Sequence, residues 1–90
     1  MAKICVHAFV SGKVQRVAFR HSTRKTALGL DLAGWAKNLE DGRVEVMLCG
    51  EEESVNRALQ WLHKGPALAK VTGVESCIEE WFEYSRFAIS

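Results

Sequence analysis

The chain has 90 residues, of which 48% are hydrophobic, and it carries 12 lysines and arginines against 11 aspartates and glutamates. This length and apolar content suit a modest core, and we expect a single domain over residues 1–90. A formal net charge of +1 is too small to hold nucleic acid or an acidic membrane surface, so neither partner is expected. The apolar run at the N-terminus is too short and interrupted for a signal peptide or a membrane span, which favours the cytoplasm.

Cysteines and histidines give no sign of a metal centre. The cysteines are widely separated and in no C-x-x-C arrangement, and the histidines lack the paired spacing of metal ligands. These residues are Cys5, Cys49, Cys77, His7, His21 and His63. We therefore expect free thiols, no metal and no organic cofactor.

The first predicted elements are a strand and a helix. Apolar residues alternate over residues 4–10, which predicts a strand with one buried face. The helical spacing of Phe19 and Ala27 with the residues between them predicts a helix from about residue 17 to residue 28. Gly29 is expected to end this helix in the left-handed conformation.

A hairpin and a second helix follow. Residues 32–38 and 43–49 are predicted strands, because Asp41 and Gly42 between them supply the positive φ of a tight turn. Residues 51–65 begin acidic and end basic, which complements a helix dipole. The remaining predicted elements are a strand over residues 70–78, after Pro66, and a short strand over residues 86–89.

This order of elements predicts an α+β fold. Under the right-handed crossover rule, β-α-β-β-α-β gives a ferredoxin-like sandwich with a mostly antiparallel sheet and two helices on one face. Antiparallel neighbours keep a constant sum of residue numbers, so Val10 opposite Val44 implies Cys5 opposite Cys49. Opposed cysteines can form a disulfide, although a reducing cytoplasm favours the two free thiols that we expect.

The segment between the first strand and the first helix has the features of an anion site. Residues 11–20 link a strand to a helix, so unpaired backbone N–H groups should converge there. Arg20 falls in the first helical turn, where the helix dipole disfavours a cation unless an anion lies against it. Spacing alone also fits an ordinary solvated arginine.

Two motifs resemble those of the acylphosphatases. They are G-x-V-Q-x-V-x-F-R at residues 12–20 and G-W-A-K-N-x-x-x-G-x-V at residues 34–44. The segment GEEESVNRALQWLHKGP and the closing F-x-I are also similar to that family, so the resemblance covers essentially the whole chain. It implies a monomeric enzyme that hydrolyses acyl phosphates to carboxylate and inorganic phosphate without metal or cofactor.

The resemblance also implies roles for particular residues. In the acylphosphatases the arginine closing the first motif binds the phosphoryl group, and the asparagine of the second positions the attacking water. These would be Arg20 and Asn38. The resemblance further implies a phosphate-binding loop made of Gln15, Arg16, Val17, Ala18, Phe19 and Arg20. By position alone, Asn38 also fits a turn asparagine before the hairpin.

The chain departs from the family pattern within this loop. Many relatives carry glycine where this chain has Arg16 and Ala18. If the backbone at Arg16 has positive φ, its side chain costs about 1 kcal/mol, and the loop can prefer another conformation when no anion is bound. Alternatively, the Arg16 guanidinium points outward and attracts anionic substrates. The sequence is compatible with both outcomes.

Two other functions fit the same fold. One is a non-catalytic module that binds phosphate or carbamoyl phosphate through the Arg20 loop. It has no evident need for a water-orienting residue such as Asn38. The other is an RNA-binding domain, which is disfavoured because Phe9 alone does not make a base-stacking platform.

Overall fold

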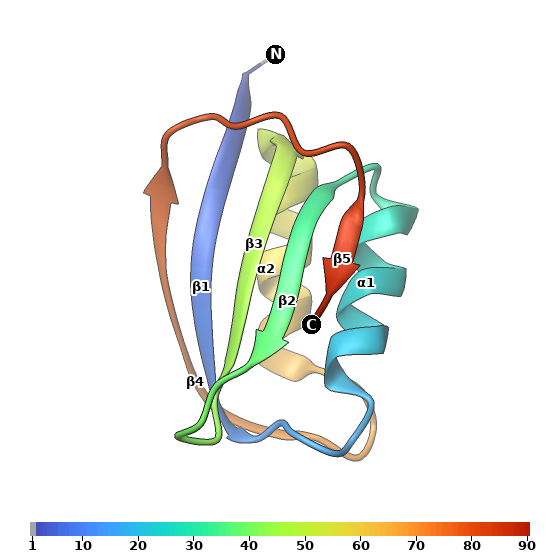
Figure 1. Cartoon of the computed structure of the whole chain (residues 1–90), viewed down its shortest axis with the longest axis vertical. Coiled ribbons are helices and arrows are strands. Elements are labelled where there is room, and N and C mark those ends of the chain that lie inside the picture. Colours follow the sequence, from blue (N-terminus) through green and yellow to red (C-terminus); the bar gives the residue numbers. More distant parts are fainter. Residues whose placement is uncertain (1) are drawn as a thin grey trace.

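The structure, a computed structural model, describes residues 2–90 as a five-stranded sheet with both helices on one face (Figure 1). The elements are β1 (Lys3–Lys13), α1 (Phe19–Gly29), β2 (Ala33–Asn38), β3 (Val44–Glu51), α2 (Glu52–Lys64), β4 (Lys70–Glu79) and β5 (Phe87–Ile89). The strand order is β4-β1-β3-β2-β5, and only the β2–β5 pair is parallel. The predicted ferredoxin-like fold is confirmed.

The core lies between the sheet and the helices. Alternate residues of the central strands face it and are at most 3% exposed: Val6, Ala8, Val10, Val44, Val46 and Leu48. α2 presents Val55, Ala58 and Leu62 to this core and packs against β1, β3 and β4, whereas α1 packs against β2 and β5. Among the described residues, no helix combines the length and apolar character needed to cross a membrane.

Both ends of α1 differ from the prediction. The helix begins at Phe19 rather than residue 17, because Ala18 has a left-handed backbone with φ 59°. The prediction that Gly29 is the left-handed cap is wrong. Gly29 is the last helical residue, and Asp31 takes the left-handed conformation with φ 58°. Two later N–H groups donate to the Ala27 carbonyl, which extends the turn past Gly29 before the chain reverses.

The predicted register of β1 and β3 is confirmed, with Val10 opposite Val44 and Cys5 opposite Cys49. In the structure a disulfide joins Cys5 and Cys49, where the sequence favoured two free thiols. Direct cross-strand pairing on the face away from the helices brings the two cysteines together. Both are buried, and the backbone N–H of Phe82 lies 3.4 Å from Cys5 Sγ.

After β4, residues 80–86 form no regular element and cross one end of the sheet to reach β5 on its far edge (Figure 1). Phe82 covers Cys5 on the way. Trp35 Nε1 then donates a hydrogen bond of 3.2 Å to the Tyr84 hydroxyl. This path delivers the last strand parallel to β2, beside the start of α1.

Candidate active site

The segments that carry the predicted site residues lie at the end of the molecule opposite to this crossing. Figure 1 shows the loop from β1 to α1 at that end, beside the point where β2 stops. Arg20 lies in the first turn of α1, and Asn38 is the last residue of β2. The Cys5–Cys49 pair lies toward the other end of β1 and takes no part in this arrangement.

The loop before Arg20 is suspended between two buried anchors. Val14 is 1% exposed and Phe19 is 2% exposed, and the Phe19 ring packs against Trp61 with 5.7 Å between ring centroids. Arg16 and Ala18 between them have φ values of 62° and 59°. Left-handed residues alternating with ordinary ones are the backbone pattern of a nest, a run of N–H groups that turn toward one side and suit an anion.

The nest leads directly into the N-terminus of α1. Ala18 is the N-cap residue, and within residues 2–90 no side chain caps this first turn. The N–H groups of the turn therefore add their partial positive charge to those of the nest. Arg16 therefore has the positive φ at which, by the sequence analysis, its side chain carries an energetic cost.

The motif glycines Gly12 and Gly34 serve the backbone rather than the chemistry. Gly12 has φ 119° at a β-bulge, and a Cβ there would lie 2.1 Å from the Lys70 carbonyl oxygen. Gly34 has φ 141°, and a Cβ there would lie 1.9 Å from the Met47 carbonyl oxygen. Because neighbouring strands approach closely at both glycines, Gly12 fixes the point where the loop leaves β1, and Gly34 fixes how β2 pairs with β3.

Gln15 ties the loop to the β2–β3 hairpin. Its side-chain Nε2 donates to the carbonyl oxygens of Leu39 at 2.8 Å and Arg43 at 2.9 Å. Leu39 directly follows Asn38, so these bonds fix the predicted water-positioning residue relative to the nest. The sequence placed Gln15 in the loop but gave no sign of this side-chain role, because its partners are backbone atoms 24 and 28 residues away.

Arg20 is held by Ser90, which follows β5. Its Nη1 donates to the main-chain oxygen of Ser90, and the backbone N–H of Ser90 donates to the Ala36 carbonyl at 3.0 Å. Ala36 lies two residues before Asn38 on β2. The guanidinium is therefore held near the end of β2 that carries Asn38. A guanidinium has five N–H donors, so donors other than the one bonded to Ser90 can bind a ligand.

Asn38 is exposed and enters the hairpin turn. The turn is fixed by Gly42, with φ 95°, and by Asp41, whose carboxylate accepts bonds from the backbone N–H and the side-chain Nε of Arg43. The backbone N–H of Arg43 holds the pKa of Asp41 below its ordinary value. Asn38 thus leads into a turn whose backbone is fixed by these bonds.

Further basic residues lie beside the site. His21 and Arg24 on α1, with Arg86 before β5, line a groove of about 450 Å³. Arg16 and Arg20 add two more cations in the loop and first turn that precede this groove, whereas the net charge of the chain is only +1. A small anion approaching the nest meets an attractive local field.

Comparison with known proteins identifies a family for the chain. A family model described as acylphosphatase matches residues 6–89. An acylphosphatase of Pseudomonas paraeruginosa is 59% identical over 75 residues, which cover 83% of this chain and 82% of that protein. The solved acylphosphatase of Coxiella burnetii is 44% identical with a TM-score of 0.95, over 98% of this chain and 93% of its own. That of Bacillus subtilis is 33% identical with a TM-score of 0.93, over 97% and 98%.

Proposed function

The chain belongs to the acylphosphatase family and is a hydrolase of that class, and we propose that its nest and Arg20 bind the phosphoryl group while Asn38 orients the attacking water. The observation that carries this proposal is the pair of left-handed residues, Arg16 and Ala18, at the start of α1. Left-handed residues at this position favour a cluster of backbone donors suited to phosphate, next in the chain to Arg20.

The binding step uses backbone and guanidinium donors. Amides of residues 15–20 bond the equatorial phosphoryl oxygens, and Arg20 supplies charge-assisted bonds to the same oxygens. Because these donors are held by Phe19, Gln15 and the Ser90 carbonyl, they need little rearrangement as charge develops. The cradle is therefore arranged for the transition state as well as for the substrate.

The chemical step is an in-line displacement at phosphorus. The Asn38 side-chain oxygen accepts a hydrogen bond from water and directs a water lone pair at the phosphorus atom. The water oxygen–phosphorus bond forms as the bond to the acyl oxygen breaks, and the electron pair leaves with the carboxylate. Since a carboxylate is a good leaving group, no strong general acid is required.

The water proton needs an acceptor, and an amide is too weak a base to keep it. We infer that a phosphate oxygen of the substrate takes the proton, which leaves inorganic phosphate and the free carboxylate. Rates in D2O and a pH profile of kcat check this step. A titrating protein base in the kcat profile, with a large solvent isotope effect, would count against it.

The deciding experiment follows benzoyl phosphate hydrolysis in EDTA by the native chain and by Arg20→Ala and Asn38→Ala. We expect native turnover, and a loss of at least about a hundredfold in each variant. The matched controls are Arg57→Ala and Asn56→Ala, which remove the same side chains from exposed positions on α2. Both controls should keep native rates.

Two results would change the proposal. Phosphate binding that depends on Arg20 without turnover would make the chain a non-catalytic phosphate or carbamoyl phosphate binder. Turnover that needs added metal would contradict the metal-independent mechanism. We also propose a cytoplasmic monomer, to be checked by cell fractionation and by light scattering of the purified chain.

A further inference from the structure

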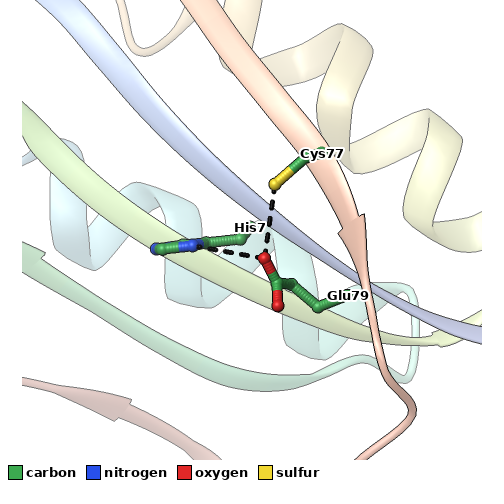
Figure 2. A group of neighbouring side chains, drawn as sticks. All are labelled: His7, Cys77 and Glu79. Atoms are coloured by element: carbon green, nitrogen blue, oxygen red, sulfur yellow. Dashed lines mark hydrogen bonds and ion pairs between the residues drawn. The ribbon is translucent and has the colours of Figure 1, made fainter.

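Three metal-ligating side chains meet on the sheet face away from the helices. His7 on β1 lies directly opposite Cys77 on β4, and Glu79 follows two residues later on the same face of β4. Figure 2 shows the three side chains converging between the two strands. Their donor atoms all lie within 4.8 Å of one another. His7 lies 70 residues before Cys77 and 72 before Glu79 in the chain, which is why sequence spacing predicted no metal centre.

The distances suit a small tetrahedral ion. Tetrahedral zinc bonded to sulfur, nitrogen and oxygen places its ligand atoms about 3.3–3.6 Å apart. Glu79 Oε2 lies 3.3 Å from Cys77 Sγ and 3.8 Å from His7 Nδ1. These two edges of a tetrahedral face are near the required lengths. The third, at most 4.8 Å, closes with a movement of about 1 Å by the exposed Cys77 side chain.

A fourth side chain fixes the histidine. Glu45 on β3 lies 2.5 Å from His7 Nε2, on the side of the ring away from Glu79. If Nε2 donates its proton to Glu45, the Nδ1 lone pair is directed at Glu79 and Cys77. A carboxylate that orients a histidine in this way is the usual outer partner of a metal-bound imidazole.

We propose that His7 Nδ1, Cys77 Sγ and Glu79 Oε2 bind one zinc-class divalent ion, with water as the fourth ligand. Thiolate and imidazole donors favour zinc and related transition ions over magnesium or calcium, which prefer oxygen ligands. Glu45 also pairs with Lys37 at 3.5 Å, so the charge that the ion compensates is chiefly that of Glu79.

The site is separate from the predicted catalytic one. It lies on the open face of the sheet, beside the rings of Phe9 and Trp35 that flank His7. The nest and Arg20 belong to the loop and helix at one end of the molecule. Metal binding is therefore expected to leave acyl phosphate hydrolysis unchanged.

Binding must release the thiol proton. The hydrogen bond to Glu79 and the negative charge of that carboxylate raise the pKa of Cys77. The ion must displace this proton to bind the thiolate. Charged or titratable side chains around the position include His7, Glu75 and Glu79, and Glu45 with its partner Lys37.

The test is a Co²⁺ titration of the metal-free chain, with the Cys5–Cys49 disulfide intact and verified by mass so that it offers no competing thiolates. We expect one equivalent to give thiolate-to-cobalt charge-transfer absorption and the visible bands of a tetrahedral ion, which stoichiometric Zn²⁺ displaces and Mg²⁺ does not. Absence of these bands in the native chain overturns the proposal without any variant.

Variants then identify the ligands. Cys77→Ser should abolish the charge-transfer band, and His7→Asn and Glu79→Gln should each weaken binding by at least about tenfold. His63→Asn, an exposed histidine on α2, is the matched control and should bind as the native chain does. Equal weakening by His63→Asn, or an unchanged band in Cys77→Ser, would also overturn the assignment.

Discussion

The phosphate loop is strained at two residues, because both have a left-handed backbone although they carry side chains. Arg16 and Ala18 have φ near 60°, where a Cβ costs about 1–2 kcal/mol and glycine costs nothing sterically. The strain persists because Val14 and Phe19 on either side are buried and hold the loop ends. The nest is therefore maintained by packing rather than by local preference.

Glycine at either strained position should stabilise the fold. We expect Ala18→Gly and Arg16→Gly each to raise the free energy of unfolding by about 0.5–1 kcal/mol, since relief of strain exceeds the added chain entropy. Urea denaturation of the single variants measures this. Ala67→Gly is the control, because Ala67 is exposed in a turn without positive φ, and it should not gain stability. A similar gain in all three variants would contradict the strain.

At the scale of elements, one side chain couples the phosphate loop to the hairpin that carries Asn38. Gln15→Glu keeps the size but turns a carboxylate toward the Leu39 and Arg43 carbonyl oxygens, so two donated bonds become repulsions. We expect kcat/KM for benzoyl phosphate to fall by about tenfold, equivalent to about 1.4 kcal/mol of transition-state stabilisation. Gln60→Glu, at an exposed position of α2, makes the same chemical change without effect.

A double variant separates positioning from simple loss of stability. If Gln15 acts by holding Asn38 in place, Gln15→Glu should cost little more activity once Asn38 is already alanine. Multiplicative losses in the double variant would show that the two residues act independently. Circular dichroism of each variant establishes that the comparison is made between folded proteins.

The packing of α2 onto the sheet gives a prediction for stability. Leu62 is 0% exposed against the core, whereas Leu68, in the turn before β4, is 74% exposed. We expect Leu62→Ala to lower the free energy of unfolding by about 2–5 kcal/mol and Leu68→Ala to change it by less than about 0.5 kcal/mol. Thermal and urea unfolding compare the two. Equal losses would mean that the core is not where the structure places it.

Hydrophobic periodicity and turn residues were enough to predict most elements and the register of β1 on β3. They failed at α1, because its start depends on the conformation of Ala18, which tertiary anchoring imposes against local preference. Arg20 and Asn38 could be predicted only through resemblance to a family. From spacing alone, Arg20 also fits a solvated surface arginine and Asn38 also fits a turn asparagine. The side-chain contacts of Gln15 and the convergence on His7 depend on strand pairing over long separations, which no local pattern reveals.

At the scale of the whole molecule, the distribution of charge affects the binding of an anionic substrate more than the net charge does. The formal total is only +1, yet Arg24 and Arg86 line one groove with His21, between α1 and β5. Screening over about 10 Å at 0.1 M salt leaves such nearby charges effective while distant ones fade. Association with an anionic acyl phosphate should therefore depend on salt more strongly than a near-neutral protein suggests.

Arg24→Gln tests this local field against a matched change elsewhere. We expect kcat/KM in about 10 mM salt to fall roughly two- to threefold, mainly through KM, and the difference from the native chain to vanish near about 0.5 M. Arg57→Gln removes the same charge from α2, where the side chain is 67% exposed and pairs with Glu53, and it should leave both values unchanged. If the two variants lower kcat/KM equally, total charge rather than the basic groove governs the approach of substrate. If neither does, backbone donors of the nest and Arg20 supply the attraction by themselves.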